Sequence, residues 1–560
     1  MTFENQRLKL SGRLTMVQRP GRYTGGEYNA VRPDPEADFR FCLLFPDIYE
    51  IGVSYHGYSI LYHVLNRMEG LSCERSYLPW RDMQSLMHNE GVRLFSIESG
   101  RPLQDFDAVG ITLQTELHYP GILRALDLAG IPRRSSERGR DDPLIIGGGP
   151  CAFHPEPVAP FFDAFLVGDG EEALPELVQL MRCREFRSAS RRDKWLQLAR
   201  LEGVYVPELY TPGPNGSVGL TGLDTASRRV RARVVTELKA QYYTGSPVVP
   251  LVRGAHDRLT VEIMRGCSRG CRFCQAGMLH RPVRERPVAD IIDQVVKGLD
   301  ATGWDEVGLL SLSTSDYSCL DDLLAALMSR LSGRRASLAF PSLHPTTFSE
   351  EMARVDLGGR KSGVTFAVEA GSRRLRNVIN KGLSEEALVE AVERAYRLGW
   401  KTVKLYFMVG LPTERMDDID EGARLLQRLA RITPYRRELH VSVSPFIPKP
   451  HSVFAREEFL DVVELRRRIR RLYSRVSGRR VKTSWHDPET SLIEALLARG
   501  SRRLSGVISR VADGGYGLDC WNDMLDLSLW HSALDEHIPG WHELLKAIPE
   551  GSALNWAHIS

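Results

Sequence analysis

The chain has 560 residues, of which 42% are apolar and 26% charged, and its formal net charge is +3. This length exceeds what one hydrophobic core usually organises, so we expect two to four domains. The near-balanced charge gives no strong attraction to nucleic acid or membrane, and no apolar run approaches the roughly 18 residues of a membrane span. The polar start, Met1–Gln18, lacks the apolar core of a signal peptide. We therefore expect a cytoplasmic protein without a membrane partner.

Short apolar runs alternate with helical patterns over residues 39–185. The expected strands and helices are Phe41–Phe45, Ile60–Met68, Ala108–Thr112, Ile122–Ala129, Leu144–Ile146 and Ala164–Val167. This alternation predicts an open, doubly wound α/β domain of the Rossmann-like type, preceded by a lead segment over residues 1–38. Residues 186–255 carry Pro212–Gly216 among β-rich stretches such as Val230–Leu238, which predicts a connector with a β-hairpin.

Six strand-then-helix repeats follow over residues 256–450. The expected strands are Thr260–Met264, Val307–Ser311, Ser337–Phe340, Gly363–Val368, Thr402–Phe407 and Leu439–Val443. Six units in about 190 residues fall short of the eight units and roughly 250 residues of a complete TIM barrel. We therefore predict a partial (βα)6 barrel of the TIM type. After Pro450 the pattern becomes helical, which predicts a helical carboxyl-terminal segment over residues 451–560.

Three of the nine cysteines crowd together directly after the first of these strands, as Cys267, Cys271 and Cys274 in a C-x3-C-x2-C spacing. In a long chain with few cysteines, this clustering indicates a metal site in a reducing compartment. Three thiolates can hold three irons of a 4Fe-4S cluster and leave the fourth iron open, whereas an electron-transfer cluster normally has four cysteine ligands. The alternative is a structural zinc ion with His280 as fourth ligand, although such sites usually pair C-x2-C with a second ligand pair.

This motif at a strand end of a partial barrel resembles the radical S-adenosylmethionine (SAM) superfamily. The resemblance implies an enzyme in which SAM binds the open iron of a 4Fe-4S cluster on Cys267, Cys271 and Cys274. It also implies reductive cleavage of SAM to a 5′-deoxyadenosyl radical, with electrons from a reductase or from a flavodoxin- or ferredoxin-type donor. The cofactors supply the chemistry, and the protein orients and shields them. The substrate and the residues that act on it stay unknown.

The same resemblance assigns SAM contacts to the other strand ends. Phe273 would seat the adenine or pack under the cluster. Ser313 and Ser315 stand where relatives often have a Gly-Gly-Glu-like element, and their hydroxyls would bind the amino group of SAM. Glu369 would bind the ribose hydroxyls, with an exposed surface carboxylate as the alternative. Gly410 would lie beside the adenine, or would form only a tight turn.

The first domain is similar to the cobalamin-binding domains that precede some radical SAM barrels. Gly147, Gly148 and Gly149 follow the expected strand at Leu144–Ile146, where glycines let the backbone approach a large ligand closely. Cobalamin domains that supply a lower imidazole carry Asp-x-His-x-x-Gly, whereas Asp47–Gly52 has no histidine at that spacing. The expectation is that cobalamin, if bound, has no protein His ligand. The alternative is a domain kept as a scaffold without a cofactor.

The leading interpretation is a radical SAM enzyme that acts on an unknown substrate, by methyl transfer or other carbon-centred radical chemistry. Its tail, with Ala498–Arg503 and Asp519–Trp521, resembles a cobalamin-type branch of radical SAM proteins that has no settled substrate. One alternative is a methylthiotransferase acting on RNA or protein. Such enzymes carry three further amino-terminal cysteines, a pattern that Cys42, Cys73 and Cys151 fit poorly.

A second alternative is a noncatalytic sensor or partner protein that binds a cluster or a corrinoid. The sequence also leaves open whether a nucleic acid is a partner. The arginine-rich run Leu465–Tyr473 could touch RNA phosphates, but arginines on several helical faces are more often a solvated surface.

Overall fold

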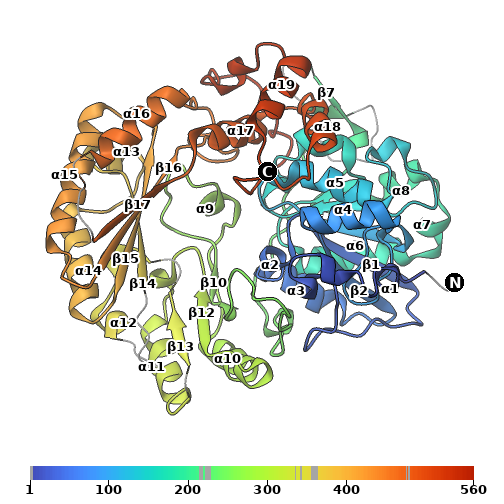
Figure 1. Ribbon diagram of the computed structural model, residues 1–560, viewed down its shortest axis with the longest axis horizontal. Helices are drawn as coiled ribbons and strands as arrows, with labels where there is room; N and C mark the ends of the chain where they lie inside the picture. Colours follow the sequence, from blue (N-terminus) through green and yellow to red (C-terminus); the bar gives the residue numbers. More distant parts are fainter. Residues whose placement is uncertain are drawn as a thin grey trace. The chain divides into compact units, whose positions relative to one another are not determined.

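A computed structural model describes residues 4–213, 218–220, 229–334, 336–340, 343–354, 363–474, 476 and 480–560 (Figure 1). The chain divides into two compact units. Unit 1 comprises Met1–Asp257, Leu497–Trp541 and Gly551–Ser560, and unit 2 comprises Arg258–Leu496 and His542–Glu550. The expected carboxyl-terminal segment over residues 451–560 is therefore divided between the two units. Among the described residues, no helix is both long and apolar enough to cross a membrane.

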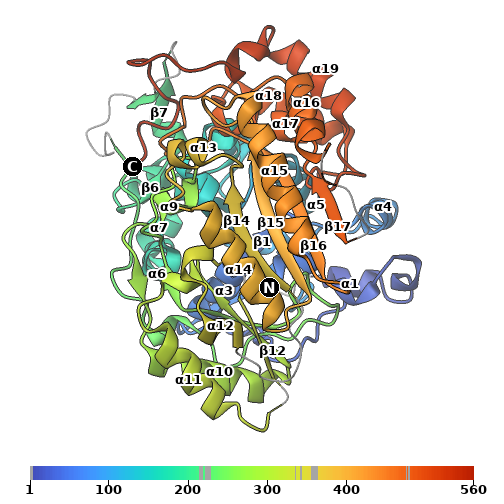
Figure 2. The same ribbon diagram turned by 90° about the vertical axis from the view of Figure 1, so that its left-hand side faces the viewer.

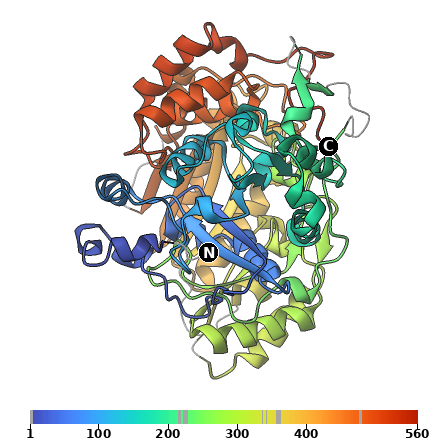
Figure 3. The same ribbon diagram turned by 90° about the vertical axis from the view of Figure 1, so that its right-hand side faces the viewer.

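Unit 1 is built on a six-stranded sheet with the order β2-β1-β3-β4-β5-β6. Figure 3 shows the first strands of this sheet in blue. All neighbouring strands are parallel except β6, which pairs antiparallel with β5. The strands are β1 (Phe39–Phe45), β2 (Leu71–Tyr77), β3 (Ala108–Thr112), β4 (Leu144–Gly148), β5 (Ala164–Leu166) and β6 (Val204–Tyr205). Parallel strands buried on both faces read as continuous apolar runs, which explains why β1, β3, β4 and β5 are predictable from the sequence.

Helices cover this sheet in two layers, as the doubly wound prediction requires. α3 (His56–Leu65) packs against α6 (Gly170–Arg182), and α4 (Arg81–Glu90) packs against α5 (Tyr119–Ala129). The chain runs from β1 outward to β2, and then crosses to the other side of β1 to form β3. This crossing makes the carboxyl ends of β1 and β3 the topological switch point, where open α/β sheets bind their ligands.

Strand β2 is absent from the sequence prediction because four of its seven residues are polar or charged, although all seven are buried. Arg75 of β2 forms ion pairs with Glu27 and with Glu98, whose carboxylate lies 2.6 Å from the Arg75 Nε. Glu74 accepts hydrogen bonds from Ser96, at 2.6 Å, and from Ser99. Charged residues can be buried when they are paired in this way. A buried strand that contains them has no apolar run, so a hydrophobicity pattern does not identify it.

The connector and the chain end close unit 1. β7 (Tyr210–Pro212) and β8 (Val218–Leu220) pair antiparallel as a hairpin, and part of the expected turn, residues 214–217, lies outside the described residues. The expectation of β-rich structure over Val230–Leu238 is wrong in its extent, because only isolated bridges form there. Val230 pairs with Ile559 in one such bridge, so the end of the chain lies against the connector.

Two further helices, α18 (Leu504–Gly514) and α19 (Leu527–His537), pack against each other in unit 1. α18 also packs on α5 and on the 3₁₀ helix η7 (Glu156–Phe161). The loop between α18 and α19 brings Cys520 and Trp521 to the sheet, where the Trp521 Nε1 donates to Asp47 at 2.9 Å. The carboxyl-terminal part of the chain is thus integral to the first domain.

Unit 2 contains two parallel sheets, with orders β13-β12-β9 and β14-β15-β16-β17. The strands are β9 (Leu259–Glu262), β12 (Glu306–Leu310), β13 (Ser337–Ala339), β14 (Gly363–Glu369), β15 (Thr402–Val409), β16 (Glu438–Pro445) and β17 (Val481–Trp485). A parallel bridge between Leu343 and Phe366 links the two sheets. All six expected strands are present in the expected order, and β17 is an additional strand in a segment expected to be helical.

The strands of unit 2 do not close into a barrel. In the part of the chain that the structure describes, no strand pairing joins β17 back to β9. The covering helices are α10 (Val288–Thr302), α11 (Leu320–Arg330), α12 (Glu350–Arg354), α13 (Arg373–Val378), α14 (Glu385–Arg397), α15 (Met416–Ile432) and α16 (Val462–Tyr473). Figure 2 shows α14 and α15 alongside β14, β15 and β16.

Candidate functional site

The cysteine loop follows β9 and is fixed by two hydrogen bonds to the residues that follow α13. The Arg272 amide donates to the Ile379 carbonyl at 3.0 Å, and the Asn380 side chain donates to the Gly270 carbonyl at 3.0 Å. Cys274 caps the short helix α9 (Gln275–Leu279), because its sulfur accepts the Gly277 amide at 3.3 Å. Amide donation to sulfur favours the thiolate form, which is the form that binds metal.

The three cysteines of the loop are not among the groups of ligand atoms that lie within 4.8 Å of one another in the described chain. The three cysteines are half-buried, which leaves the loop open on one side.

Two thiols of the loop, those of Cys271 and Cys274, have raised pKa values. Burial raises the pKa of Cys271 and of Cys274 above the ordinary thiol value. The ammonium group of Lys381 acts in the opposite direction on Cys271 but does not outweigh burial. Metal binding releases the thiol protons, so occupation of the loop is favoured by higher pH.

Phe273 packs against an apolar cluster at the carboxyl ends of three strands. The cluster consists of Ala370, Leu375, Ile379, Leu411, Phe446 and Phe454. Ala370 directly follows β14, and Leu411 and Phe446 lie just beyond β15 and β16. The ring of Phe273 therefore belongs to an apolar floor beside the cysteine loop, and its contact with adenine stays a prediction.

Ser313 and Ser315 both have protein partners. The Ser313 hydroxyl donates to Asp316 at 2.7 Å, and Asp316 accepts from the Arg269 guanidinium, whose Nε lies 2.6 Å away. Ser315 accepts the His344 amide at 3.1 Å. The end of β12 is thereby tied to the cysteine loop through Arg269. The sequence reasoning missed this ion pair because its two residues lie far apart in the chain.

Glu369 is buried, so the alternative of an exposed surface carboxylate is wrong. Its exposed fraction is 9%, and one carboxylate oxygen lies 3.2 Å from the Lys381 ammonium. Its backbone φ is +67°, in the left-handed region, and the pairing register of β14 with β15 shifts beside it. Non-glycine residues adopt this conformation at a cost, and such residues cluster at functional sites.

Gly410 follows β15 and forms a tight turn around a buried carboxylate. Its φ is +82°, and its amide donates to Glu414 at 2.7 Å. Burial raises the pKa of Glu414 to about 7, although Arg468 of α16 lies 2.7 Å from the same carboxylate and acts to lower it. A side chain at position 410 would meet Leu465 at 2.8 Å. The turn requires glycine, and its contact with a cofactor stays a prediction.

The side of β15 and β16 turned away from the helices is polar. The register pairs Lys404 with His440 and Tyr406 with Ser442, and 46% of Tyr406 is exposed. The alternate residues on the same strands are fully buried and apolar. A complete TIM barrel fills its interior with apolar layers. Here this face, which we call the polar face (Lys404, Tyr406, His440 and Ser442), is accessible instead.

The three glycines at the end of β4, Gly147 to Gly149, differ in their surroundings. A side chain at Gly147 would meet the Phe165 ring at 2.6 Å, and Gly149, with φ of +110°, lies against the Leu113 carbonyl. Packing therefore explains these two glycines. A Cβ at Gly148 would find only the Leu166 carbonyl oxygen, 3.8 Å away. Gly148 thus leaves open space at the carboxyl edge of the sheet.

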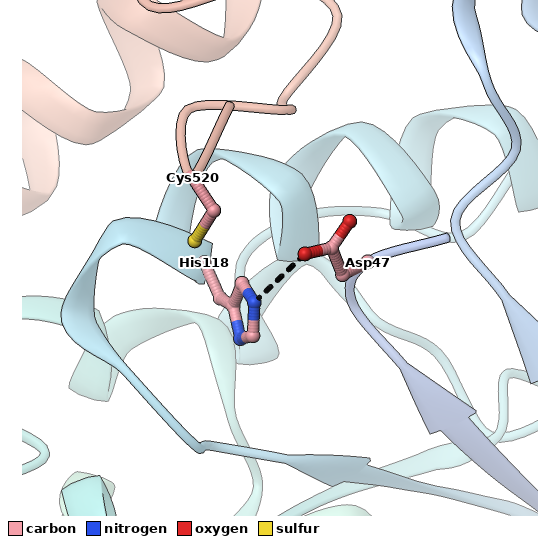
Figure 4. Close-up of side chains that lie close together, drawn as sticks. All are labelled: Asp47, His118 and Cys520. Carbon is pink, nitrogen blue, oxygen red and sulfur yellow. Dashed lines mark hydrogen bonds and ion pairs between the residues drawn. The ribbon is translucent and has the colours of Figure 1, made fainter. Parts of the chain in front are cut away.

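A second cluster of polar side chains lies at the switch point of unit 1 (Figure 4). Asp47 follows β1, and His118 ends the 3₁₀ helix η4 (Glu116–His118) that follows β3. The His118 Nε2 lies 3.4 Å from an Asp47 carboxylate oxygen. The sequence reasoning sought a histidine only within Asp47–Gly52 and so missed His118. The available signal was that parallel neighbours β1 and β3 end at the same edge of the sheet.

The remaining predicted features are not assembled into a site. Cys42 lies inside β1 and Cys73 inside β2, and burial raises the pKa of both thiols well above the ordinary value. Cys151 is also buried. The arginines of α16 are largely paired: Arg468 binds Glu414 and Glu464, and Arg471 binds Asp420. This pairing agrees with a solvated helix surface.

Comparison with known protein families places these observations in context. Residues 57–207 match the model of the amino-terminal domain of radical SAM proteins, and residues 261–426 match the radical SAM superfamily model. The second match covers the cysteine loop and β9 to β15. This chain is a radical SAM protein. The radical SAM family consists of enzymes that use a 4Fe-4S cluster and SAM, so the expected enzyme class and these two cofactors are confirmed.

Three similar proteins illustrate the range of this radical SAM protein's relatives. It is 26% identical over 467 residues to an uncharacterized protein of Methanocaldococcus jannaschii, covering 83% of this chain and 89% of that one. It is 27% identical over 190 residues to the tRNA-2-methylthio-N(6)-dimethylallyladenosine synthase of Thermotoga petrophila, covering 32% of this chain and 42% of that protein. The structure of the methyltransferase TsrM from Kitasatospora setae with cobalamin and [4Fe-4S] cluster bound matches with a TM-score of 0.49 and 16% identity, covering 72% and 74% of the two chains.

Proposed function

We propose that Cys267, Cys271 and Cys274 hold the 4Fe-4S cluster at which this enzyme cleaves SAM reductively, and that the radical chemistry acts on a polar substrate. The observation that carries the proposal is the cysteine loop itself. Its three half-buried cysteines have the C-x3-C-x2-C spacing, and the loop is fixed by hydrogen bonds to Ile379 and Asn380. When bound, the cluster supplies the electron that breaks a carbon-sulfur bond of SAM.

The strand ends around the loop supply SAM contacts in this proposal. The buried carboxylate of Glu369 accepts hydrogen bonds from the ribose, and its contact with Lys381 orients it. Phe273 and its apolar floor support the adenine. Ser313 offers a hydroxyl toward the amino group, and Gly410 gives the backbone of its turn a close approach to the adenine.

The polar face supports a polar substrate. A lysine, a histidine, a tyrosine and a serine face away from the helices on β15 and β16, where a packed barrel would carry apolar residues. Glu438 pairs with His440 at 2.8 Å and with Lys482 of β17 at 2.9 Å, so further polar groups lie beside this face. Such groups bind hydroxyl, carboxylate or phosphate groups better than hydrocarbon.

Unit 1 is proposed to bind a corrinoid whose cobalt has no protein histidine ligand. Its sheet order places a ligand crevice at the carboxyl ends of β1 and β3, and Gly148 leaves space at the same edge. His118 lies at this edge but is buried, so its imidazole is not proposed as a cobalt ligand. Methyl transfer is the chemistry that such a cofactor would add.

A methylthiotransferase activity is less well supported. A second cluster would need three accessible amino-terminal thiolates, but Cys42 and Cys73 lie inside strands of the sheet with raised pKa values. In the proposed setting the partners are the substrate and a reductase or a flavodoxin- or ferredoxin-type electron donor. None of the nine cysteines forms a disulfide, which favours a reducing, cytoplasmic location.

The test is the formation of 5′-deoxyadenosine by the anaerobically reconstituted chain with SAM and a strong reductant. We expect slow formation by the wild type and by Cys319→Ala, a matched control because Cys319 is an exposed thiol of the same unit. We expect none from Cys274→Ala. A Cys274→Ala variant as active as the wild type would refute the assignment of the cluster loop.

A further inference from the structure

We propose that Asp47, His118 and Cys520 form a site for a single zinc ion in unit 1. All three residues belong to this unit, and none belongs to the cysteine loop. Their possible ligand atoms lie within 4.8 Å of one another, a condition that no other group of three or more His, Cys, Asp and Glu residues meets in the described chain. The site would be additional to the iron-sulfur cluster.

The three side chains come from segments that are distant in the sequence. Asp47 and His118 follow adjacent parallel strands, and Cys520 lies in the loop between α18 and α19. Figure 4 shows the three side chains close together, with a dashed line that joins the His118 ring to the Asp47 carboxylate. Convergence of three ligands from separate segments is typical of a site that stabilises a fold when the metal binds.

The distance between Asp47 and His118 suits a metal better than an ion pair. The His118 Nε2 and the Asp47 Oδ2 are 3.4 Å apart. Charge-assisted hydrogen bonds are shorter, about 2.7 to 2.9 Å. In tetrahedral zinc sites with bonds near 2.0 to 2.1 Å, two nitrogen or oxygen ligands lie roughly 3.3 Å from each other. The observed separation of 3.4 Å between Nε2 and Oδ2 is close to this ligand–ligand distance.

The remaining hydrogen bonds orient the two ligands. The Asp47 Oδ1 accepts the Ile48 amide at 2.7 Å and the Trp521 indole at 2.9 Å, which leaves Oδ2 for a metal. His118 is 4% exposed, and its Nδ1 has no hydrogen-bond partner among the described residues. A buried imidazole held by one long contact is poorly satisfied, and a metal bond at Nε2 would replace that contact with a strong one.

The ligand set indicates the metal. Cysteine, histidine and aspartate together bind zinc, whereas calcium and magnesium prefer oxygen ligands alone. Three protein ligands leave one position for water, so the site could polarise a bound group as well as link the chain's tail to the sheet. Coordination through His118 would also keep this imidazole away from any corrinoid at the same edge.

The test uses cobalt(II) as a visible substitute for zinc. The full-length chain with Ala at positions 267, 271 and 274 removes iron-sulfur absorbance, and cobalt(II) is then titrated into it. We expect one equivalent per chain with a thiolate-to-cobalt charge-transfer band. The band should disappear in Cys520→Ala and persist in Cys183→Ala, an exposed cysteine of the same unit. Asp47→Asn, which keeps an oxygen for Trp521, should weaken binding at least tenfold.

Two further measurements keep the test independent of folding defects. Circular dichroism must show that each variant is folded, and zinc analysis of the wild-type chain with its cluster should give one zinc per chain. No cobalt uptake by folded protein, or an unchanged band in Cys520→Ala, would overturn the proposal. Much faster alkylation of the Cys520 thiol than of the Cys183 thiol in metal-free protein would also overturn the proposal, because it would indicate that Cys520 is a nucleophile activated by His118 and Asp47.

Discussion

Replacement of Glu369 separates the strain of its backbone from the function of its carboxylate. With φ of +67°, Glu369 adopts a conformation that costs a non-glycine residue roughly 1 to 2 kcal/mol. Glu369→Gly and Glu369→Ala both remove the carboxylate and its contact with Lys381, but only glycine relieves the strain. We therefore expect the Gly variant to be more stable than the Ala variant by about 1 kcal/mol. In ordinary strand positions the order is reversed, with glycine less stable by about 0.5 to 1 kcal/mol.

Two assays measure the two effects. Calorimetry should place the melting temperature of Glu369→Gly about 2 to 4 °C above that of Glu369→Ala, for a unit of this size. Both variants should bind SAM equally poorly, because a hydrogen bond to a charged group contributes about 1.5 to 3 kcal/mol, equivalent to a roughly 10- to 150-fold loss of affinity. Glu393→Ala, on the exposed face of α14, is the control and should change neither quantity.

The outcomes that contradict this reasoning are distinct. An Ala variant at least as stable as the Gly variant would show that the backbone of Glu369 is unstrained. Unchanged SAM affinity in both variants, with intact clusters, would remove Glu369 from the cofactor site.

Three further predictions concern unit 1. Gly148→Leu should fold normally, because a Cβ at this position meets only one backbone oxygen, at 3.8 Å. The variant should nevertheless lose uptake of hydroxocobalamin, measured after gel filtration. Equal uptake by the variant and the wild type would contradict the corrinoid proposal. Gly147→Ala should instead lower the melting temperature, because its Cβ would lie 2.6 Å from an aromatic ring. Burial raises the pKa of Glu156, but His558 and Arg502 outweigh it and lower the pKa to about 2. The ionised carboxylate therefore stabilises the folded chain above pH 4.5, the unfolded pKa, and this stabilisation is lost as the pH falls towards 2. Urea unfolding of the wild type over this pH range should show a decrease in the free energy of unfolding of at most about 3 kcal/mol, and Glu156→Gln should not show this decrease.

The sequence predicts most of unit 2 because its strands repeat one simple pattern. β14, β15 and β16 are flanked by amphipathic helices, and the cysteine spacing identifies the loop after β9 without any structure. β17, which is mostly exposed and contains Lys482 and Ser484, has no apolar pattern, and its pairing with β16 is what makes it a strand. Pairing partners of this kind are not visible in local sequence.

The missed features of unit 1 depend on long-range contacts. β2 is hidden by Arg75, whose charge is neutralised by carboxylates distant in the chain. His118 belongs to no sequence motif. It lies near Asp47 and Cys520 only because β1 and β3 are neighbouring strands and the loop that contains Cys520 packs at their ends. The sequence could identify the glycines after β4, but only packing distinguishes Gly148 from its neighbours.

The most direct test of the central claim is electron spin resonance of the reduced cluster with and without SAM. We predict that the wild-type chain shows one 4Fe-4S signal, that SAM changes this signal by binding the open iron, and that Ala at positions 267, 271 and 274 abolishes the signal with the bound iron and sulfide. Full iron and sulfide in the triple variant would contradict the cysteine assignment. A fully loaded wild-type cluster whose signal does not respond to SAM would contradict the enzyme mechanism and favour a noncatalytic cluster-binding protein.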